Sequence, residues 1–97
     1  MELRVLRYFL ETAREGNMTR AAERLHVTQP TLSKQIKELE NELGKKLFER
    51  HNFSVSLTEE GMILRKRAED LLAIADKIED EFKTMEVHLH LHGFLFI

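Results

Sequence analysis

Small polar and basic side chains gather between residues 28 and 37. Gln29 carries an amide that can pair with adenine, and Lys34 carries an ammonium group that can donate to guanine acceptors. Thr31 and Ser33 are short, so a backbone that carries them can approach the edges of bases closely. The next acid is Glu38, which leaves the stretch from residue 29 to residue 37 without negative charge. This pattern predicts an edge that reads double-stranded DNA in the major groove.

A helix is expected to carry these side chains. Thr28 is a good N-cap, and Pro30 fits the first turn, where its missing N–H costs no hydrogen bond. Gly44 follows the last apolar position and is expected to end the helix in a left-handed conformation. The apolar stripe that would bury the opposite side comprises Leu32, Ile36, Leu39 and Leu43.

Two further helices are predicted before this one. The first ends at Gly16, and its apolar stripe comprises Leu3, Leu6, Phe9, Leu10 and Ala13. We expect Thr19 to cap a short second helix from residue 20 to about residue 25. This helix would bury Ala21, Ala22 and Leu25, and residues 26–28 would form a turn. Residues 18–37 therefore have the order of a helix-turn-helix, in which the second helix enters the major groove.

A hairpin is predicted directly after the third helix. Residues 47–50 and 55–57 are two short strand-like runs, and Asn52 favours a turn between them. Arg50 could lie along the minor groove or on the DNA backbone, and Asn52 could reach a phosphate. The fold expected for residues 1–58 is mainly α, a winged helix-turn-helix with three helices and a two-stranded β wing at residues 48–57.

A long linker helix is expected over residues 59–86. Thr58 would cap it, and Met62 or Ile63 would pack its first turn on the chain's own core. Apolar residues then recur with gaps of 4, 3, 4, 3, 4 and 3, which is the heptad spacing of paired helices. The predicted dimerisation seam comprises Leu64, Ala68, Leu71, Ala75, Ile78, Phe82 and Met85.

Composition narrows the class of protein. The net charge is −2, but residues 1–58 hold ten Lys and Arg against eight Asp and Glu, and residues 59–97 hold five against nine. This division is compatible with DNA contacting only the first part. There is no cysteine, no apolar run of about 20 residues and no recognisable catalytic set, so we expect a cytoplasmic protein that is not an enzyme and uses no cofactor.

The last eleven residues follow neither pattern. His88, His90 and His92 alternate with other residues, and on a strand they would share one face that could ligate Zn²⁺ or Ni²⁺. The interpretation that we prefer is a tail unrelated to the rest, or the first strand of a truncated domain. No metal site is therefore predicted.

The helix-turn-helix resembles that of LysR-type transcriptional regulators. Residues 21–36 read AAERLHVTQPTLSKQI, and the similarity continues through LE at 39, LG at 43, LFER at 47 and LTEEG at 57. It covers residues 2–86, and it implies a bacterial regulator that reads operator DNA as a dimer, or as a tetramer made of two dimers. The residues that it places on DNA, together with the cap Thr28, are Gln29, Pro30, Thr31, Ser33 and Lys34 in the major groove, Thr19 and Lys37 on phosphates, and Arg50 and Asn52 on the wing.

Three departures from this resemblance affect the expected binding. Lys34 stands where the family often has arginine, so a bidentate guanine contact becomes a point-charge contact. Phe53 stands at a wing position that is often basic. The family's effector domain does not follow the linker helix, so we expect no small-molecule effector for this chain. The alternative function is a fragment that pairs with a full-length regulator and does not act on its own operator.

Overall fold

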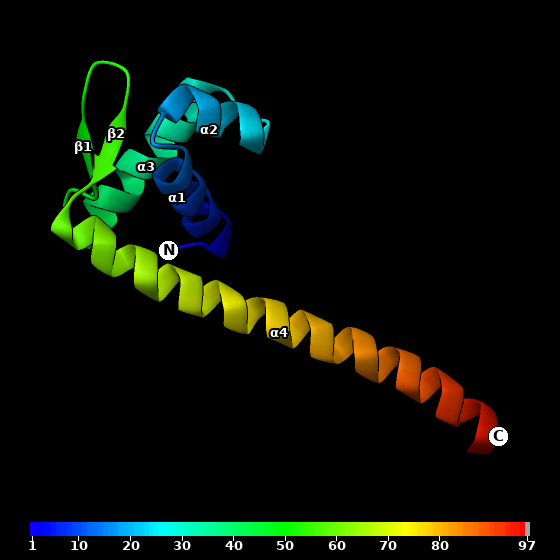
Figure 1. The fold of residues 1–97 in the computed structure, drawn as a ribbon. Coiled ribbons are helices and arrows are strands. Elements are labelled where there is room, and N and C mark those ends of the chain that lie inside the picture. The colour runs from blue at the N-terminus through cyan, green and yellow to red at the C-terminus, as the bar shows by residue number, and fades with distance from the viewer. Residues whose placement is uncertain (97) are drawn as a thin grey trace.

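Three short helices, a hairpin and one long helix follow one another along the chain in this computed structural model (Figure 1). The structure describes the backbone of residues 1–96 and the side chains of residues 1–85. The elements are α1 (Leu3–Glu15), α2 (Met18–Leu25), α3 (Gln29–Leu43), β1 (Phe48–Arg50), β2 (Val55–Leu57) and α4 (Glu59–Phe96). This order confirms the mainly α winged helix-turn-helix fold. We call residues 1–58, which hold the first three helices and the wing, the head.

The predicted helix ends are largely confirmed. Gly16 and Gly44 follow α1 and α3 in the left-handed conformation, with φ of 64° and 69°. The Thr28 hydroxyl caps α3 by accepting a hydrogen bond from the Thr31 N–H at 3.3 Å. His26 ends α2 and is also left-handed, with φ of 58°, a conformation that is strained for a residue with a Cβ.

The predicted cap of α2 is wrong. Asn17, not Thr19, stands at the N-cap, and its side-chain oxygen accepts a hydrogen bond from the Arg20 N–H at 2.9 Å. Thr19 is an exposed residue in the first turn of α2. Both residue types cap helices well. The two positions differ because the Asn17 side chain also donates to the Phe53 carbonyl of the wing.

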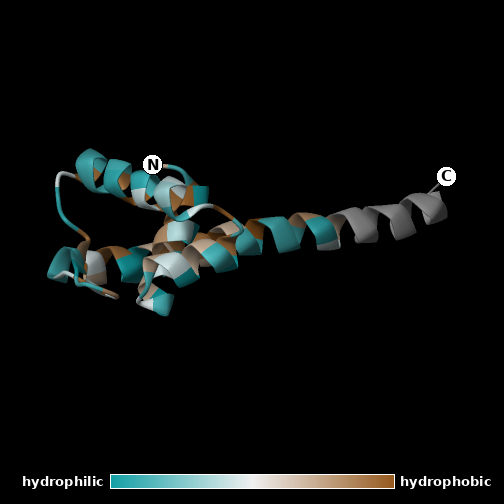
Figure 2. Cartoon of the chain, turned by 90° about the horizontal axis from the view of Figure 1, so that it is seen from above, coloured by the Kyte–Doolittle hydropathy of each residue, from teal (hydrophilic) through white to brown (hydrophobic). Residues whose placement is uncertain are grey.

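The core of the head lies between the three helices and the wing. Phe9 of α1 and Phe48 of β1 are both buried, with ring centroids 5.3 Å apart. Figure 2 shows hydrophilic residues along the outer faces of these helices. Leu3 and Leu43, predicted to be buried, are exposed because they lie at the free ends of α1 and α3, and Val5 is buried instead. The buried apolar residues are Val5, Leu6, Phe9, Met18, Ala21, Ala22, Leu32, Ile36, Leu39, Leu47, Phe48, Ala68 and Leu72.

The wing is an antiparallel pair in which Phe48, Glu49 and Arg50 face Leu57, Ser56 and Val55 in turn. The Glu40 carboxylate of α3 fixes its start, because one oxygen accepts hydrogen bonds from the Leu47 N–H at 2.7 Å and from the Phe48 N–H at 3.3 Å.

The start of α4 packs closely on the residues that immediately precede β1. Thr58 donates its N–H to the Leu47 carbonyl at 3.0 Å and its hydroxyl to the Lys46 carbonyl at 2.7 Å. The same hydroxyl accepts from the Gly61 N–H at 3.0 Å, which confirms Thr58 as the cap. A Cβ at Gly61 would lie 2.2 Å from the Leu47 carbonyl oxygen, so only glycine fits there without a shift of backbone.

The face of α4 that packs on the head differs from the prediction. Gly61 and Leu72 are buried, whereas Met62 and Ile63 are exposed. Ala68 was predicted to face a partner, but it is only 1% exposed and belongs to the core of its own head. Leu64 is partly buried against the same core.

The long helix α4 also contacts α1 and extends further than predicted. Arg7 of α1 forms an ion pair with Asp76 of α4 at 3.1 Å. The helix continues past the predicted end at residue 86, and the side chains of His88, His90 and His92 lie outside the described residues. Over the described part of the chain, no helix is long and apolar enough to cross a membrane.

Candidate nucleic-acid interface

The N-terminal half of α3 presents a polar edge to solvent. Its buried side rests on the core through Leu32, Ile36 and Leu39. Ser33 is half-buried, since it borders this stripe. The exposed residues of the edge and its cap are Thr28, Gln29, Pro30, Thr31, Lys34 and Lys37. Eight of the predicted DNA contacts, counting Ser33 and Thr19 on the neighbouring α2, therefore come from the helix-turn-helix.

The hydroxyl groups of Thr28 and Thr31 are hydrogen-bonded to each other. Thr28 donates its hydroxyl hydrogen to the Thr31 oxygen at 2.8 Å while its own oxygen caps the helix. The Thr31 hydroxyl thus has an internal donor, and its own hydrogen is left to point outward. This arrangement presents Thr31 as a donor toward an acceptor such as guanine O6 or a phosphate oxygen.

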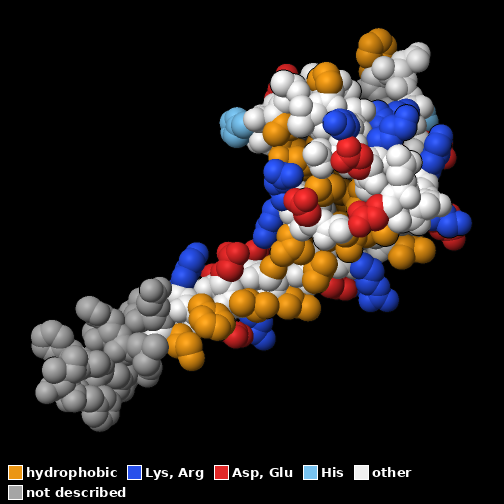
Figure 3. Space-filling view, turned by 180° about the vertical axis from the view of Figure 1, so that it is seen from behind, with side chains coloured by type: hydrophobic (Ala, Val, Ile, Leu, Met, Phe, Trp, Pro, Cys, Tyr) orange, Lys and Arg blue, Asp and Glu red, His pale blue; other side chains and the backbone are white. Residues whose placement is uncertain are grey.

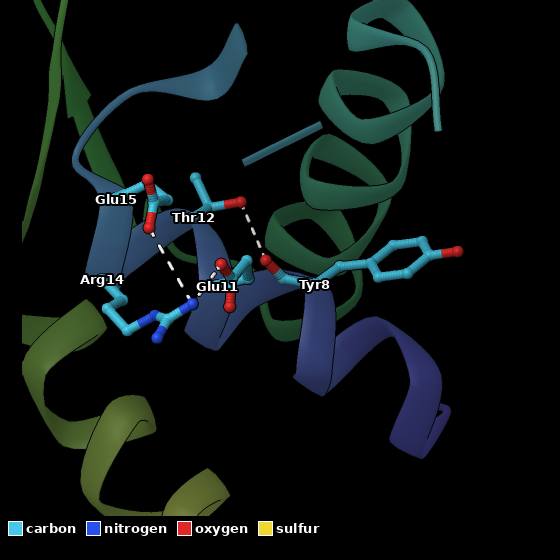
Figure 4. Close-up of polar contacts among 5 residues, drawn as sticks. All are labelled: Tyr8, Glu11, Thr12, Arg14 and Glu15. Atoms are coloured by element: carbon cyan, nitrogen blue, oxygen red, sulfur yellow. Dashed lines mark hydrogen bonds and ion pairs between the residues drawn. The ribbon is translucent and has the colours of Figure 1, made fainter. Parts of the chain in front are cut away.

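Basic groups on this edge are not neutralised by neighbouring acids. Lys34 and Lys37 are exposed, and neither forms an ion pair with another described residue. Arg14 on α1 is different, because it contacts Glu11 at 2.5 Å and Glu15 at 3.8 Å (Figure 4). Its hydrogen bond with the Glu11 carboxylate raises the pKa of Arg14 above its usual value. The cations that are available to bind phosphate therefore include those of α3.

The wing is attached to the junction between α1 and α2. The Asn17 side chain donates to the Phe53 carbonyl at 2.9 Å, and the Val55 N–H donates to the Gly16 carbonyl at 2.9 Å. Arg50 and Asn52 are exposed on this anchored hairpin. Asn17 was not predicted as a site residue, although an asparagine directly after the helix-ending Gly16 is itself a signal for a cap.

The groups that α3 and the wing expose are of the kinds that bind DNA. Among the described side chains, no group of three or more His, Asp or Glu is arranged to hold a metal ion. What α3 and the wing provide together is hydrogen-bond donors, an amide and unpaired positive charge on one rigid support. These are the groups that recognise base edges and phosphates.

A family model described as bacterial regulatory helix-turn-helix protein, lysR family, matches residues 3–62. The chain belongs to the LysR family. The match confirms the resemblance found in the sequence, and it includes α1, α2, α3, the wing and the start of α4.

Named relatives and solved structures agree with this assignment. The HTH-type transcriptional regulator XapR of Escherichia coli (strain K12) is 51% identical over 77 residues, which are 79% of this chain and 26% of that protein. The crystal structure of a CbnR_DBD-DNA complex superposes with a TM-score of 0.83 at 39% identity, covering 88% of this chain and 98% of that one. The BenM_DBD/catB site 1 DNA complex superposes with a TM-score of 0.84 at 42% identity, covering 88% and 94%. The chain thus spans about a quarter of the length of relatives such as XapR.

Proposed function

We propose that this LysR-family chain is a sequence-specific DNA-binding transcription regulator that inserts α3 into the major groove of operator DNA. The observation that carries the proposal is the exposed, acid-free edge of α3 beside an anchored wing. The similarity to two DNA-binding domains solved with DNA supports it. A regulator of this kind acts on the bacterial chromosome, so the proposal includes a cytoplasmic location and no enzymatic role.

The proposed contacts follow from the geometry of the edge. Side chains in the first two turns of α3 reach base edges, whereas Lys37, further along the helix, reaches the phosphates that flank them. Ser33 would contribute least, because it is half-buried against the core. The proposed base contacts are Gln29, Pro30, Thr31, Ser33 and Lys34, and the proposed backbone contacts are Thr19, Thr28, Lys37, Arg50 and Asn52.

We further propose that two copies pair through α4. Next to the face that packs on the head, α4 carries an apolar face whose members are 40 to 65% exposed, and Figure 3 shows these side chains gathered along one edge of the helix. Ile74 belongs to this face although the heptad count omitted it, and Ala75 is half-buried at its border. The exposed members are Leu71, Ile74, Ile78, Phe82 and Met85.

The DNA-binding proposal is tested by selecting duplexes from a random pool and measuring affinity by fluorescence anisotropy at several salt concentrations. Gln29→Ala should relax the preference at one base pair by about 1–3 kcal/mol. Lys37→Ala should weaken all duplexes alike and reduce the salt slope by about one. Lys77→Ala, an exposed lysine on α4, is the matched control and should change neither quantity. Equal affinity for selected and scrambled duplexes would overturn the proposal.

The pairing proposal is tested by light scattering over a range of protein concentrations. Ile78→Glu places a charge in the middle of the apolar face and should give a monomer, because an unpaired charge cannot be buried between two helices without cost. Lys77→Glu places the same charge one residue away, outside the face, and should leave the dimer intact. A wild-type mass that stays monomeric at every concentration would contradict the proposal.

A further inference from the structure

Phe53 exposes a whole aromatic ring at the tip of the wing. Its exposed fraction of 89% is the largest among the exposed large hydrophobic residues of the described chain. The others lie along α4 or at the chain start and helix ends, as for Leu3 and Leu43, whereas Phe53 lies in the four-residue turn between β1 and β2. No packing within the head accounts for an apolar ring at this position.

The ring is carried on a fixed backbone. The Phe53 carbonyl accepts from the Asn17 side chain at 2.9 Å, and the turn is closed by a hydrogen bond from the His51 N–H to the Ser54 carbonyl at 2.9 Å. The His51 ring also lies 3.1 Å from the Ser56 hydroxyl across the hairpin. Because Asn17 is the cap of α2, the tip holds a constant position relative to the helix-turn-helix. The backbone of the tip therefore loses little conformational freedom on binding, and only the Phe53 side chain must be ordered.

The surroundings of the ring match one kind of partner. Residues 50–54 contain arginine, histidine and asparagine but no acid, so a polyanion can approach the tip without repulsion from it. A wing beside the recognition helix faces the minor groove, where apolar side chains can contact sugar walls and base edges. A·T pairs leave the floor of that groove open, whereas the guanine 2-amino group projects into it.

We propose that Phe53 is a specificity-determining contact that lies in the minor groove beside each half-site and selects A·T pairs there. This inference rests on the proposed DNA-binding function and adds to it a read-out that is independent of charge. At a G·C pair the 2-amino group of guanine occupies the space that the ring would fill, so the ring loses its contact with the floor of the groove. Arg50 and Asn52 bind the wing to the DNA backbone, and Phe53 discriminates A·T pairs from G·C pairs.

The test combines protein variants with a base analogue. Replacing adenine by 2,6-diaminopurine at the flanking pairs adds the 2-amino group in the minor groove and leaves the major groove unchanged. This replacement should weaken the wild type about fivefold or more, as expected for loss of part of a buried phenyl contact. It should leave Phe53→Ala unaffected. Phe53→Ala on the unmodified duplex should show a similar loss, with an unchanged salt slope.

Two further variants separate the contact from charge and from folding. Phe53→Lys should bind with a salt slope steeper by about 0.9, because it replaces an apolar contact by a phosphate contact. Met62→Ala, which shortens another exposed apolar side chain in the first turn of α4 and outside the wing, is the matched control and should bind like the wild type. All variants should keep the wild-type melting temperature, since neither side chain is part of the core.

Several outcomes would overturn the inference. Phe53→Ala could bind all duplexes as the wild type does, or diaminopurine could weaken both proteins equally. A lower mass for Phe53→Ala in light scattering, with unchanged DNA affinity, would show that the ring contacts a second copy of the chain instead. Failure of the wild type to prefer any selected duplex would instead refute the proposed function itself, before the ring is tested.

Discussion

Gly61→Ala is expected to be strongly destabilising even though alanine is the best helix former. The new Cβ would lie 2.2 Å from the Leu47 carbonyl oxygen and 2.9 Å from a methyl group of Leu57. The methyl group can move, but the carbonyl is held, because it accepts the Thr58 N–H at 3.0 Å. The start of α4 must therefore move away from the segment that precedes β1.

The magnitude follows from three terms. Alanine gains at most about 1 kcal/mol over glycine in a helix. Overpacking costs about 1–3 kcal/mol, and weakening the hydrogen bonds of Thr58 to the Lys46 and Leu47 carbonyls costs about 1 kcal/mol each. The net loss is about 2–4 kcal/mol, which for a domain of this size lowers the melting temperature by at least roughly 8 to 16 °C.

Urea unfolding followed by circular dichroism measures this loss. Gly44→Ala is a useful control, because Gly44 has φ of 69° but nothing within 4 Å of an added Cβ. It should lose only the cost of the left-handed conformation, about 1 kcal/mol. If Gly61→Ala proved as stable as the wild type, α4 would not be in close contact with the Leu47 carbonyl at Gly61.

Three further substitutions test other parts of the head. His26→Gly should stabilise the protein by about 0.5–1 kcal/mol, because glycine adopts the left-handed conformation at the end of α2 without strain, and a lower urea midpoint would contradict this. Asn17→Ala should lose about 1–2 kcal/mol, whereas Asn17→Asp should lose less in the same urea assay, because it keeps the cap and gives up only the donor to the wing tip. Equal losses in these two variants would mean that the cap adds nothing to stability, and no loss in Asn17→Asp would mean that the wing contact adds nothing. Glu40→Ala should lose about 2 kcal/mol by leaving two backbone N–H groups at the start of β1 without their acceptor, and thermal unfolding that matches the wild type would rule this out.

Features that depend on a few neighbouring residues could be predicted from the sequence. Gly16, Thr28 and Gly44 end or begin helices because of their own backbone and side-chain chemistry, and the structure places each as expected. The wing strands and the order of elements follow from the same short-range signals. The exposed edge of α3 could also be predicted, since burial of Leu32, Ile36 and Leu39 turns the polar residues outward.

Features that depend on distant partners could not be predicted in this way. Asn17 and Thr19 are comparable caps, and only the structure shows that Asn17 also bonds to a carbonyl 36 residues away. The heptad count treats every apolar residue of α4 alike. The close approach of Gly61 to the Leu47 carbonyl sets the orientation of α4 about its own axis. In this orientation Ala68 and Leu72 face the head and Ile74 is exposed, which the heptad count could not show.

The position of the apolar face on α4 has a consequence for the operator. The same helix fills the core of the head through Ala68 and Leu72 and is tied to α1 by the Arg7–Asp76 ion pair. The head therefore has no flexible connector to the face that would pair with a second copy. In such a dimer the two heads cannot rotate to follow a half-site that has moved around the duplex. A spacer lengthened by about five base pairs, half of the roughly 10.5-base-pair turn, would place one half-site on the wrong side of the DNA. A spacer lengthened by a full turn would restore the rotational phase but not the distance between the half-sites. A dimer of this kind would therefore bind only operators whose half-sites have one fixed separation.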